Sequence, residues 1–319
     1  MNNKLKVASL FAGIGGICRG FNNVGAEVIW ANEFDKNACI SYRENFGSNY
    51  LVEADIRDIK TENVPEFDIL TSGFPCQAFS IAGYRKGFDD ERGNLFFQTL
   101  RFIVEKQPKA FLLENVKNLV SHDKGKTFKV ITEALKENGY YIKYDILNTM
   151  KYSNLPQNRE RIYIVGFKKK EQCDMFQFPQ PIELTKSIHD IIDVTDKKEE
   201  RYYYENSKYY PMLLENMHRK DTVYQLRRIY VRENKSCVCP TLTANMGTGG
   251  HNVPLIIDDY GIRKLTPREC FGFQGFDNFK FPVKMCNGQL YKQIGNSVSV
   301  KVIEKIAQNI IKVLEEYKS

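Results

Sequence analysis

The sequence has no run of about 18 apolar residues, the length that a membrane-spanning helix requires. Its first residues lead directly into a strand-like stretch, so we expect neither a signal peptide nor a membrane span. The eight cysteines form no CxxC pair, and no matching His or Cys pair lies near Cys237 and Cys239. We therefore expect reduced thiols in a cytosol and no metal site.

The chain also lacks internal repeats, low-complexity segments and the GxGxxG spacing that is typical of nicotinamide-dependent dehydrogenases. Its 319 residues suffice for one large domain or two ordinary ones, and 42% of them are hydrophobic. The net charge of +7 is a mild basic bias. These values predict a globular protein with a substantial core, and they fit a polyanionic partner without requiring one.

The N-terminal residues predict the start of a nucleotide-binding βα unit. An apolar strand over 6–10 precedes a glycine-rich turn, 11–16, and a helix follows over 17–24. Glycines let the backbone approach a ligand closely, and a helix N-terminus favours a negative group. Taken alone the turn is weak evidence, because many tight turns require glycine.

Carboxylates follow the next two predicted strands. Glu33 lies about 20 residues after the glycine turn, where folds of this kind hold ribose hydroxyls. Its alternative role is to stabilise the N-terminus of a helix over 36–45. Asp55, followed by Ile56, ends a third strand. Together these strand ends predict a ligand that carries a ribose and a base.

Cys76 lies in the stretch Gly73-Phe74-Pro75-Cys76-Gln77, directly after a short buried strand over 67–71. Ligands bind at the carboxyl ends of strands in open α/β sheets, so this thiol is a candidate nucleophile. Pro75 stiffens the turn that presents it. The alternative is that Cys76 is a small buried hydrophobe, which is the more usual role of a lone cysteine.

Three further charged residues complete the candidate site. Glu114 follows an apolar strand over 110–113, where desolvation would raise its pKa and make it a proton donor; a helix-capping acid is the alternative. Arg159 and Arg161 alternate in an extended stretch and so project to the same side. They could grip a carbonyl or phosphates, or they could belong to a surface charge cluster.

The composition changes after residue 168. Residues 184–262 are polar and rich in tyrosine, basic residues and, near 247–250, glycine, so we expect a small second domain there that suits nucleic acid. The first domain comprises residues 1–183 plus 294–319, and 263–293 form a hinge region. Thr266 is expected to cap a helix that begins at Pro267.

The motifs occur in an order that resembles the DNA cytosine-5 methyltransferases, and most closely the small bacterial enzymes of restriction–modification systems. The resemblance covers nearly the whole chain. It rests on these stretches: Phe11-Ala12-Gly13-Ile14-Gly15-Gly16, Pro75-Cys76, Glu114-Asn115-Val116, Gln157-Asn158-Arg159-Glu160-Arg161, Arg268-Glu269-Cys270 and Gly295-Asn296-Ser297.

The resemblance implies an α/β fold: a Rossmann-like, S-adenosylmethionine-dependent methyltransferase domain with a smaller, loop-rich target-recognition domain. It implies methyl transfer from S-adenosylmethionine to C5 of a cytosine within a short specific sequence of double-stranded DNA. The expected protein is a monomer in the bacterial cytoplasm, associated with the nucleoid through DNA. A cognate restriction endonuclease would act separately.

Each matched residue then has an implied role. Cys76 adds to C6 of a cytosine that has flipped out of the duplex. Glu114 contacts the ring at N3 and at the exocyclic amine, and Arg159 and Arg161 form a basic pair, with Arg161 on the carbonyl O2. Loss of the C5 proton and β-elimination then free Cys76.

The implied cofactor contacts divide among several strand ends. They are Phe11, Gly13 and Gly15 on the methionine side, Glu33 on the ribose, Asp55 and Ile56 on the adenine, and further contacts from Phe74, Asn296 and Ser297. The implied DNA contacts are Ser80 on a phosphate, Gln225 in the gap left by the flipped base, and Thr241 in the Thr241-Leu242 signature of the recognition domain. Residues 78–93 resemble a loop that closes over DNA, although Ala82 stands where some relatives carry serine.

Two alternatives remain open at this point. One is the same chemistry on tRNA, but the distinctive Cys-Phe-Thr tripeptide of that branch is absent from the sequence. The other is a catalytically silent DNA-binding relative, against which the intact Cys76, Glu114 and Arg161 argue.

Overall fold

The computed structural model describes residues 4–75, 95–227, 229–248 and 252–317. Cys76 and Ser80 lie outside the described residues. The chain forms two compact units, in which unit 1 comprises Met1–Leu147, Glu160–Gln180 and Val302–Ser319 and unit 2 comprises Asn148–Arg159 and Pro181–Lys301. The chain therefore passes between the units four times.

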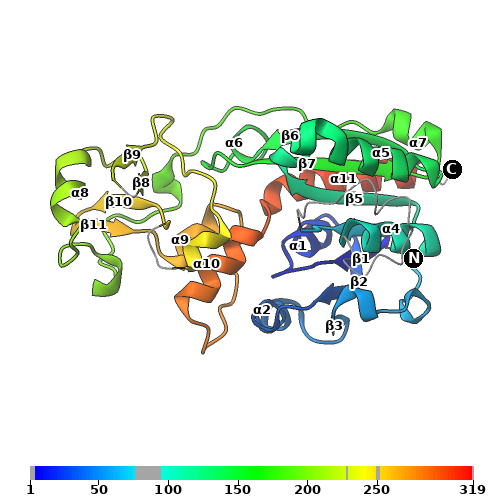
Figure 1. Ribbon diagram of the computed structural model, residues 1–319, viewed down its shortest axis with the longest axis horizontal. Helices are drawn as coiled ribbons and strands as arrows, with labels where there is room; N and C mark the ends of the chain where they lie inside the picture. Colours follow the sequence, from blue (N-terminus) through cyan, green and yellow to red (C-terminus); the bar gives the residue numbers. More distant parts are fainter. Residues whose placement is uncertain (1–3, 76–94, 228, 249–251, 318–319) are drawn as a thin grey trace. The chain divides into compact units, whose positions relative to one another are not determined.

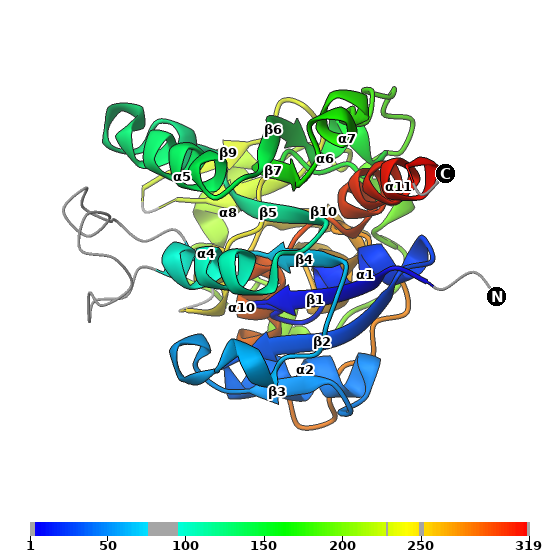
Figure 2. The same ribbon diagram turned by 90° about the vertical axis from the view of Figure 1, so that its right-hand side faces the viewer.

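Unit 1 is built on a seven-stranded sheet with the order β3-β2-β1-β4-β5-β7-β6. In Figure 2 these strands lie one below another, from β6 at the top to β3 at the bottom. The strands are β1 (Lys6–Leu10), β2 (Glu27–Glu33), β3 (Leu51–Glu53), β4 (Ile69–Ser72), β5 (Ala110–Val116), β6 (Tyr141–Asn148) and β7 (Glu160–Phe167). The first five strands pair in parallel, and β7 runs antiparallel to β5.

The order of the strands reverses between β1 and β4, because the chain builds outward from β1 to β3 and then from β4 to β5. Such a switch point leaves a crevice at the carboxyl ends of the two central strands, and ligands of open α/β sheets bind there. The central strands are buried along nearly their whole length, as expected for parallel strands covered on both faces.

Helices provide the cover in unit 1. They are α1 (Gly16–Asn23), α2 (Lys36–Phe46), α4 (Leu95–Lys106), α5 (Lys126–Glu137), α7 (Lys170–Met175) and α11 (Val300–Glu316), which starts in unit 2. The apolar faces of α4 and α5 share one core with β1, β4 and β5. Helices α1 and α11 touch so closely at Gly20 that a Cβ there would lie 2.4 Å from Cγ2 of Ile303.

Unit 2 contains a four-stranded antiparallel sheet with the order β11-β10-β8-β9 (Figure 1). Its strands are β8 (Tyr224–Leu226), β9 (Val231–Glu233), β10 (Leu255–Asp258) and β11 (Gly261–Lys264), and its helices are α6 (Thr149–Tyr152), α8 (Tyr210–Asn216), α9 (Pro267–Gly272) and α10 (Asn287–Asn296). Tyr224 and Leu226 of β8 pack with Leu213 of α8 in a small apolar core.

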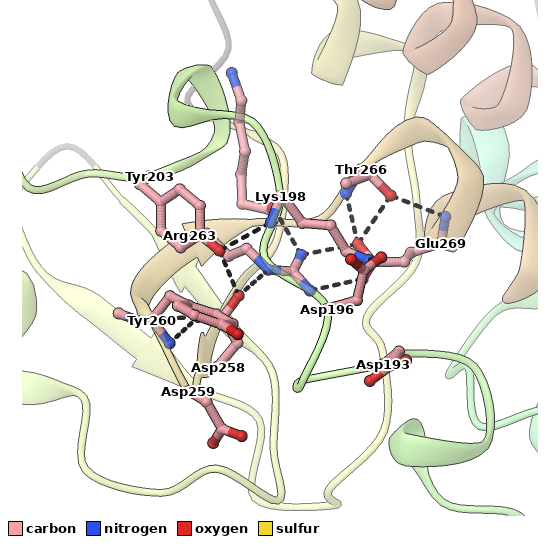
Figure 3. Close-up of polar contacts among 12 residues, drawn as sticks. Asp193, Asp196, Lys198, Tyr203, Asp258, Asp259, Tyr260, Arg263, Thr266 and Glu269 are labelled. Carbon is pink, nitrogen blue, oxygen red and sulfur yellow. Dashed lines mark hydrogen bonds and ion pairs between the residues drawn. The ribbon is translucent and has the colours of Figure 1, made fainter.

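A buried ion cluster joins β10, β11 and α9. Figure 3 shows the guanidinium of Arg263 between the carboxylates of Asp258 and Glu269. Its Nε donates to Asp258 at 2.6 Å, and its two terminal nitrogens donate to Glu269 at 2.9 and 2.7 Å. Arg263 is fully buried, and Glu269 also forms a capping box with Thr266. The sequence prediction of a capped helix at Pro267 is therefore confirmed.

One feature differs from the sequence-based expectation. Strand β5 continues to Val116, so Glu114 lies within the strand rather than after it. Residues 263–293 belong to unit 2 and carry α9 and most of α10. Among the described helices, none combines the length and the apolar content needed to cross a membrane.

Candidate active site

The glycine-rich turn follows β1 at the switch point of the sheet. Gly15 is the N-cap of α1 and has a φ of 85°, a left-handed conformation that glycine adopts without strain. A Cβ on Gly15 would also lie 2.3 Å from the ring of Phe46. Gly13 has a φ of 57°, and a Cβ there would meet no atom within 4 Å. Only glycine is therefore accommodated at Gly15, whereas the space beside Gly13 is unoccupied by protein atoms within 4 Å.

Glu33 closes this turn from the end of β2. Its Oε2 accepts from Gly13 N at 2.8 Å, and its Oε1 accepts from the backbone nitrogens of Phe34 and Asp35 at 2.9 and 2.8 Å. Burial raises the pKa of the Glu33 carboxyl above its ordinary value, and these hydrogen bonds oppose the shift. A carboxylate has about four lone-pair positions, so Oε2 retains capacity for one more donor, such as a ribose hydroxyl.

Phe34 is a candidate that the sequence reasoning missed. It follows Glu33 directly, and its side chain is 68% exposed, which is unusual for a large aromatic residue. An exposed aromatic ring next to the ribose position offers a stacking platform for a base. The signal was present in the sequence as an aromatic residue immediately after a strand-end acid.

Asp55 and Ile56 lie just beyond β3. The Asp55 carboxylate accepts from the backbone and side chain of Arg57, and the side-chain hydrogen bond lowers the pKa of Asp55. The Ile56 side chain is buried in the core of unit 1. A ligand at this position would therefore meet the backbone of Ile56 rather than its side chain.

Glu114 and Arg161 form the most buried ion pair of this region. Nε of Arg161 lies 3.2 Å from Oε1 of Glu114, and the two side chains are only 13% and 11% exposed. Arg161 also donates from Nη1 to the carbonyl of Glu160 at 2.8 Å. Its Nη2 has no hydrogen-bond partner among the described residues, so it can donate to a carbonyl oxygen of a ligand.

The residues that follow β4 lie at the same edge of the sheet and precede the candidate nucleophile in the sequence. β4 pairs in parallel with β5, and a Cβ on Gly73 would lie 3.7 Å from Oε2 of Glu114. Asn115 donates from Nδ2 to the carbonyl of Phe74 at 2.8 Å, while the Phe74 ring is buried against Phe96. Asn115 thus fixes the backbone just ahead of Pro75-Cys76, a contact that sequence reasoning did not foresee.

Phe11 packs against the core of unit 1, and the other remaining sequence-predicted residues belong to unit 2. Arg159 is 1% exposed, and its guanidinium donates to three backbone carbonyls of unit 2. Thr241 donates its hydroxyl to the carbonyl of Asn158 at 2.7 Å. Gln225 lies within β8 and accepts from Arg227 at 3.2 Å.

Asn296 ends α10 and is exposed, and Ser297 follows it half-buried. The Arg159 guanidinium donates to carbonyls of unit 2, whereas Glu114 and Arg161 belong to unit 1. Among the described residues, no group of three His, Cys, Asp or Glu could hold a metal ion.

These features define an α/β methyltransferase-like fold with a carboxylate, a guanidinium and a glycine turn at the carboxyl edge of one sheet. Comparison with known proteins identifies the class: the chain belongs to the C-5 cytosine-specific DNA methylase family, whose profile matches residues 5–312. The resemblance inferred from the motifs is therefore confirmed, and the protein is a DNA cytosine-5 methyltransferase.

Individual relatives are similar to this chain over nearly their full lengths. The Type II methyltransferase M.Bsp6I of Bacillus sp. (strain RFL6) is 60% identical, over 97% of this chain and 99% of the relative. M.HhaI of Haemophilus parahaemolyticus is 38% identical, over 96% and 94%. The structure of S. pombe Dnmt2 methyltransferase shares the fold, with a TM-score of 0.74 at 21% identity over 99% and 100% of the two chains.

A mutant of Spodoptera frugiperda DNMT2 also shares the fold, with a TM-score of 0.75 at 18% identity over 96% of this chain and 99% of that one. The sequence prediction of an α/β methyltransferase fold is confirmed.

Proposed function

We propose that this chain is the modification enzyme of a Type II restriction–modification system and methylates one cytosine within a short sequence of double-stranded DNA. The relatives that cover the whole chain carry Type II names, which supports this role. We further propose that Glu114, Arg161 and Cys76 act on the cytosine and that the methyl donor binds at the glycine turn. The observation that carries the proposal is the Glu114–Arg161 pair beside the strand end that leads to Cys76.

The Watson–Crick edge of cytosine matches this pair. Nη2 of Arg161 would donate to O2, and a protonated Glu114 carboxyl would donate to N3 and accept from the exocyclic amine. Both contacts stabilise the negative charge that develops on the ring when a nucleophile adds at C6. The low exposure of the pair strengthens these contacts, because water is largely excluded there.

In the proposed reaction the Cys76 thiolate forms a bond to C6, and the electron pair of the C5–C6 double bond becomes available at C5. S-adenosylmethionine, when bound, supplies the methyl group that C5 takes up. A base then removes the C5 proton, the C5–C6 double bond reforms, and the bond between C6 and the Cys76 sulfur breaks. Cys76 leaves as the thiolate, so the enzyme is regenerated.

The residues of the glycine turn fit the proposed donor. Glu33 retains one acceptor position on Oε2, and the exposed Phe34 ring lies next to it in the chain. A Cβ on Gly13 would meet no atom within 4 Å, so the space beside this glycine is open to the proposed donor. Because the rings of Phe11 and Phe74 pack against the core of unit 1, we assign these two residues a role through the backbone.

We assign recognition of the DNA sequence to unit 2. Residues Gln225 and Thr241 remain candidate DNA contacts, as do Asn296 and Ser297 for the cofactor. The Gln225 side chain is paired with Arg227, and opposite it in β9 stands the exposed Arg232. Glutamine and arginine are the side chains that read adenine and guanine edges, so this face of the hairpin suits the major groove.

Transfer of tritiated methyl groups from S-adenosylmethionine to duplex DNA and to tRNA, measured side by side, tests the proposal. We expect incorporation into duplex DNA only. Bisulfite sequencing of DNA from a host that lacks other cytosine methylation would then identify the target sequence. Incorporation into tRNA alone, or into neither substrate, would overturn the proposed function.

A further inference from the structure

Arg159 is one of the two largest fully buried side chains of the described residues, and the other is Arg263. Nη1 of Arg159 donates to the carbonyl of Leu242 at 2.7 Å. Its Nη2 donates to the carbonyl of Gly295 at 3.3 Å and also to that of Ser297. One guanidinium therefore binds the 239–247 segment and the C-terminal end of α10 at once.

The backbone around Arg159 binds the same segment. Asn158 N donates to the carbonyl of Cys239 at 2.8 Å, and Cys239 N donates to the carbonyl of Pro156 at 2.7 Å. The Thr241 hydroxyl donates to the carbonyl of Asn158. These bonds run along the segment, so its position follows that of residues 156–159.

Helix α10 meets the segment without room for side chains. A Cβ on Gly295 would lie 2.1 Å from the backbone carbon of Thr243, and a Cβ on Gly247 would lie 2.5 Å from the carbonyl oxygen of Gly288. Real Cβ atoms do not approach backbone atoms so closely, so only glycine is accommodated at either position. Two glycines and one arginine thus determine how the short helix η8 (Ala244–Gly247) lies on α10.

We infer that Arg159 is a positioning residue for DNA recognition rather than a group that touches the cytosine. Arg159 holds the 239–247 segment in position. The segment contains Thr241 and further polar side chains, which reach DNA from that position. Thr243 and Asn245 of this segment are exposed, as is Thr248 directly after it. The inference rests on the proposed assignment of recognition to unit 2.

The two possible roles of Arg159 predict opposite kinetics. A residue that contacts the cytosine in the transition state changes kcat, whereas one that positions a DNA-binding segment changes the KM for DNA. Replacing Arg159 by Met removes all its donors, while Arg159→Lys keeps the charge and part of the hydrogen bonding. We expect Arg159→Met to raise the KM for DNA at least tenfold with kcat within about threefold, and Arg159→Lys to recover part of the loss.

Gly295→Ala tests the same junction from the side of the helix. Its added methyl group overlaps the Thr243 backbone, so the segment must move although every donor of Arg159 is still present. We expect the same rise in KM for DNA and reduced discrimination between the target sequence and sequences that differ by one base pair. An unchanged KM in this variant would overturn the inference.

Arg263→Lys is the matched control, because Arg263 is equally buried in unit 2 but binds carboxylates that join β10, β11 and α9. We expect this variant to lower Tm without changing the KM for DNA. If it does not fold, Asp258→Asn replaces it as the control. An Arg159 variant that lowers kcat strongly at unchanged KM would show a catalytic contact, and one that changes Tm alone would show a purely structural role; either result overturns the inference.

The wild-type enzyme separates this inference from the proposed function. If wild-type protein transfers no methyl group to duplex DNA, then the proposed function fails regardless of Arg159. If it does methylate DNA, the KM and discrimination values of Arg159→Met, Gly295→Ala and Arg263→Lys test the positioning role alone.

Discussion

Nε of Arg161 lies 3.2 Å from Oε1 of Glu114, and the register of the strands explains why. Arg161 stands opposite Val116 at the start of β7, and the antiparallel pairing brings its side chain back along β5 to Glu114. Strand pairing therefore sets this contact, and no loop has to close to form it. The Arg161 guanidinium is thus held in advance at the place where the proposed reaction develops negative charge.

Replacing Glu114 by Gln should lower kcat by about 100-fold or more, because the contact with the ring strengthens in the transition state. Steady-state methylation of duplex DNA checks this, with KM expected to change little. Glu160→Gln is the control, since its ion pair with Lys117 is half-exposed and should contribute little. A rise in KM without loss of kcat would contradict the assigned role of Glu114.

Replacing Cys76 by Ser should abolish methyl transfer while DNA binding survives, because a serine hydroxyl is a far weaker nucleophile than a thiolate at neutral pH. Band-shift affinity and methyl incorporation are measured on the same preparation. Cys286→Ser, which changes an exposed cysteine of unit 2, serves as the control and should retain activity. Turnover in the Cys76 variant would remove that residue from the mechanism.

Cofactor binding should weaken on acidification at a pH above 4.5, the ordinary pKa of a glutamate. Burial raises the pKa of Glu33, and a protonated Glu33 loses acceptor capacity for a ribose hydroxyl. The effect on folding has the opposite sign. The native state holds this proton more tightly than the unfolded chain, so Glu33 alone increases the unfolding free energy as pH falls through this window.

Isothermal titration with S-adenosylhomocysteine across this pH range measures the effect. Glu33→Gln cannot take up the proton, so its weaker affinity should vary less with pH. An identical pH profile in the wild type and in this variant would show that Glu33 is not the titrating group.

Gly15→Ala should destabilise unit 1 by about 2–5 kcal/mol, because it combines a left-handed backbone with overlap against the Phe46 ring. Gly25→Ala is the matched control: its φ is 95°, but a Cβ there would meet nothing within 4 Å. It should lose only about 1–2 kcal/mol. Denaturant unfolding of both variants measures the change in unfolding free energy. Equal decreases in the two variants would mean that the Phe46 ring moves away from the added methyl group at no cost.

Exchanging residues 184–262 for those of a relative with a different target should change the methylated sequence. The reason is that Gln225 of β8, Arg232 of β9 and the 239–247 segment lie within this range. Bisulfite sequencing of host DNA reads the result directly. The exchanged chain must retain methyl transfer for the experiment to count, and an unchanged target sequence would place recognition elsewhere.

The sequence predicted the strands of the switch point well because their signals are local. The apolar runs predicted over 6–10, 67–71 and 110–113 correspond to β1, β4 and β5, although β5 extends three residues further to Val116. Arg159 shows where such reasoning stops. Two arginines in an extended stretch were expected to point the same way, but the chain passes from one unit to the other between them.

Residues such as Leu242 and Gly295 receive the donors of Arg159 from 83 and 136 residues away, so no spacing rule could reveal the contact. Helix α10 was missed for a related reason. Its glycines, Gly288 and Gly295, are unfavourable in a helix and are present because the backbone of another segment comes close.

The four passages of the chain between the units have a consequence for engineering and for folding. Unit 2 is not one insertion that can be excised, since residues 148–159 belong to it and 160–180 do not. A fragment that ends before β7 would therefore leave the sheet of unit 1 incomplete. A fragment that ends before α11 would leave unit 1 without one of its covering helices. Split versions of this enzyme should regain activity only when both pieces are present during folding, because neither piece contains a complete core.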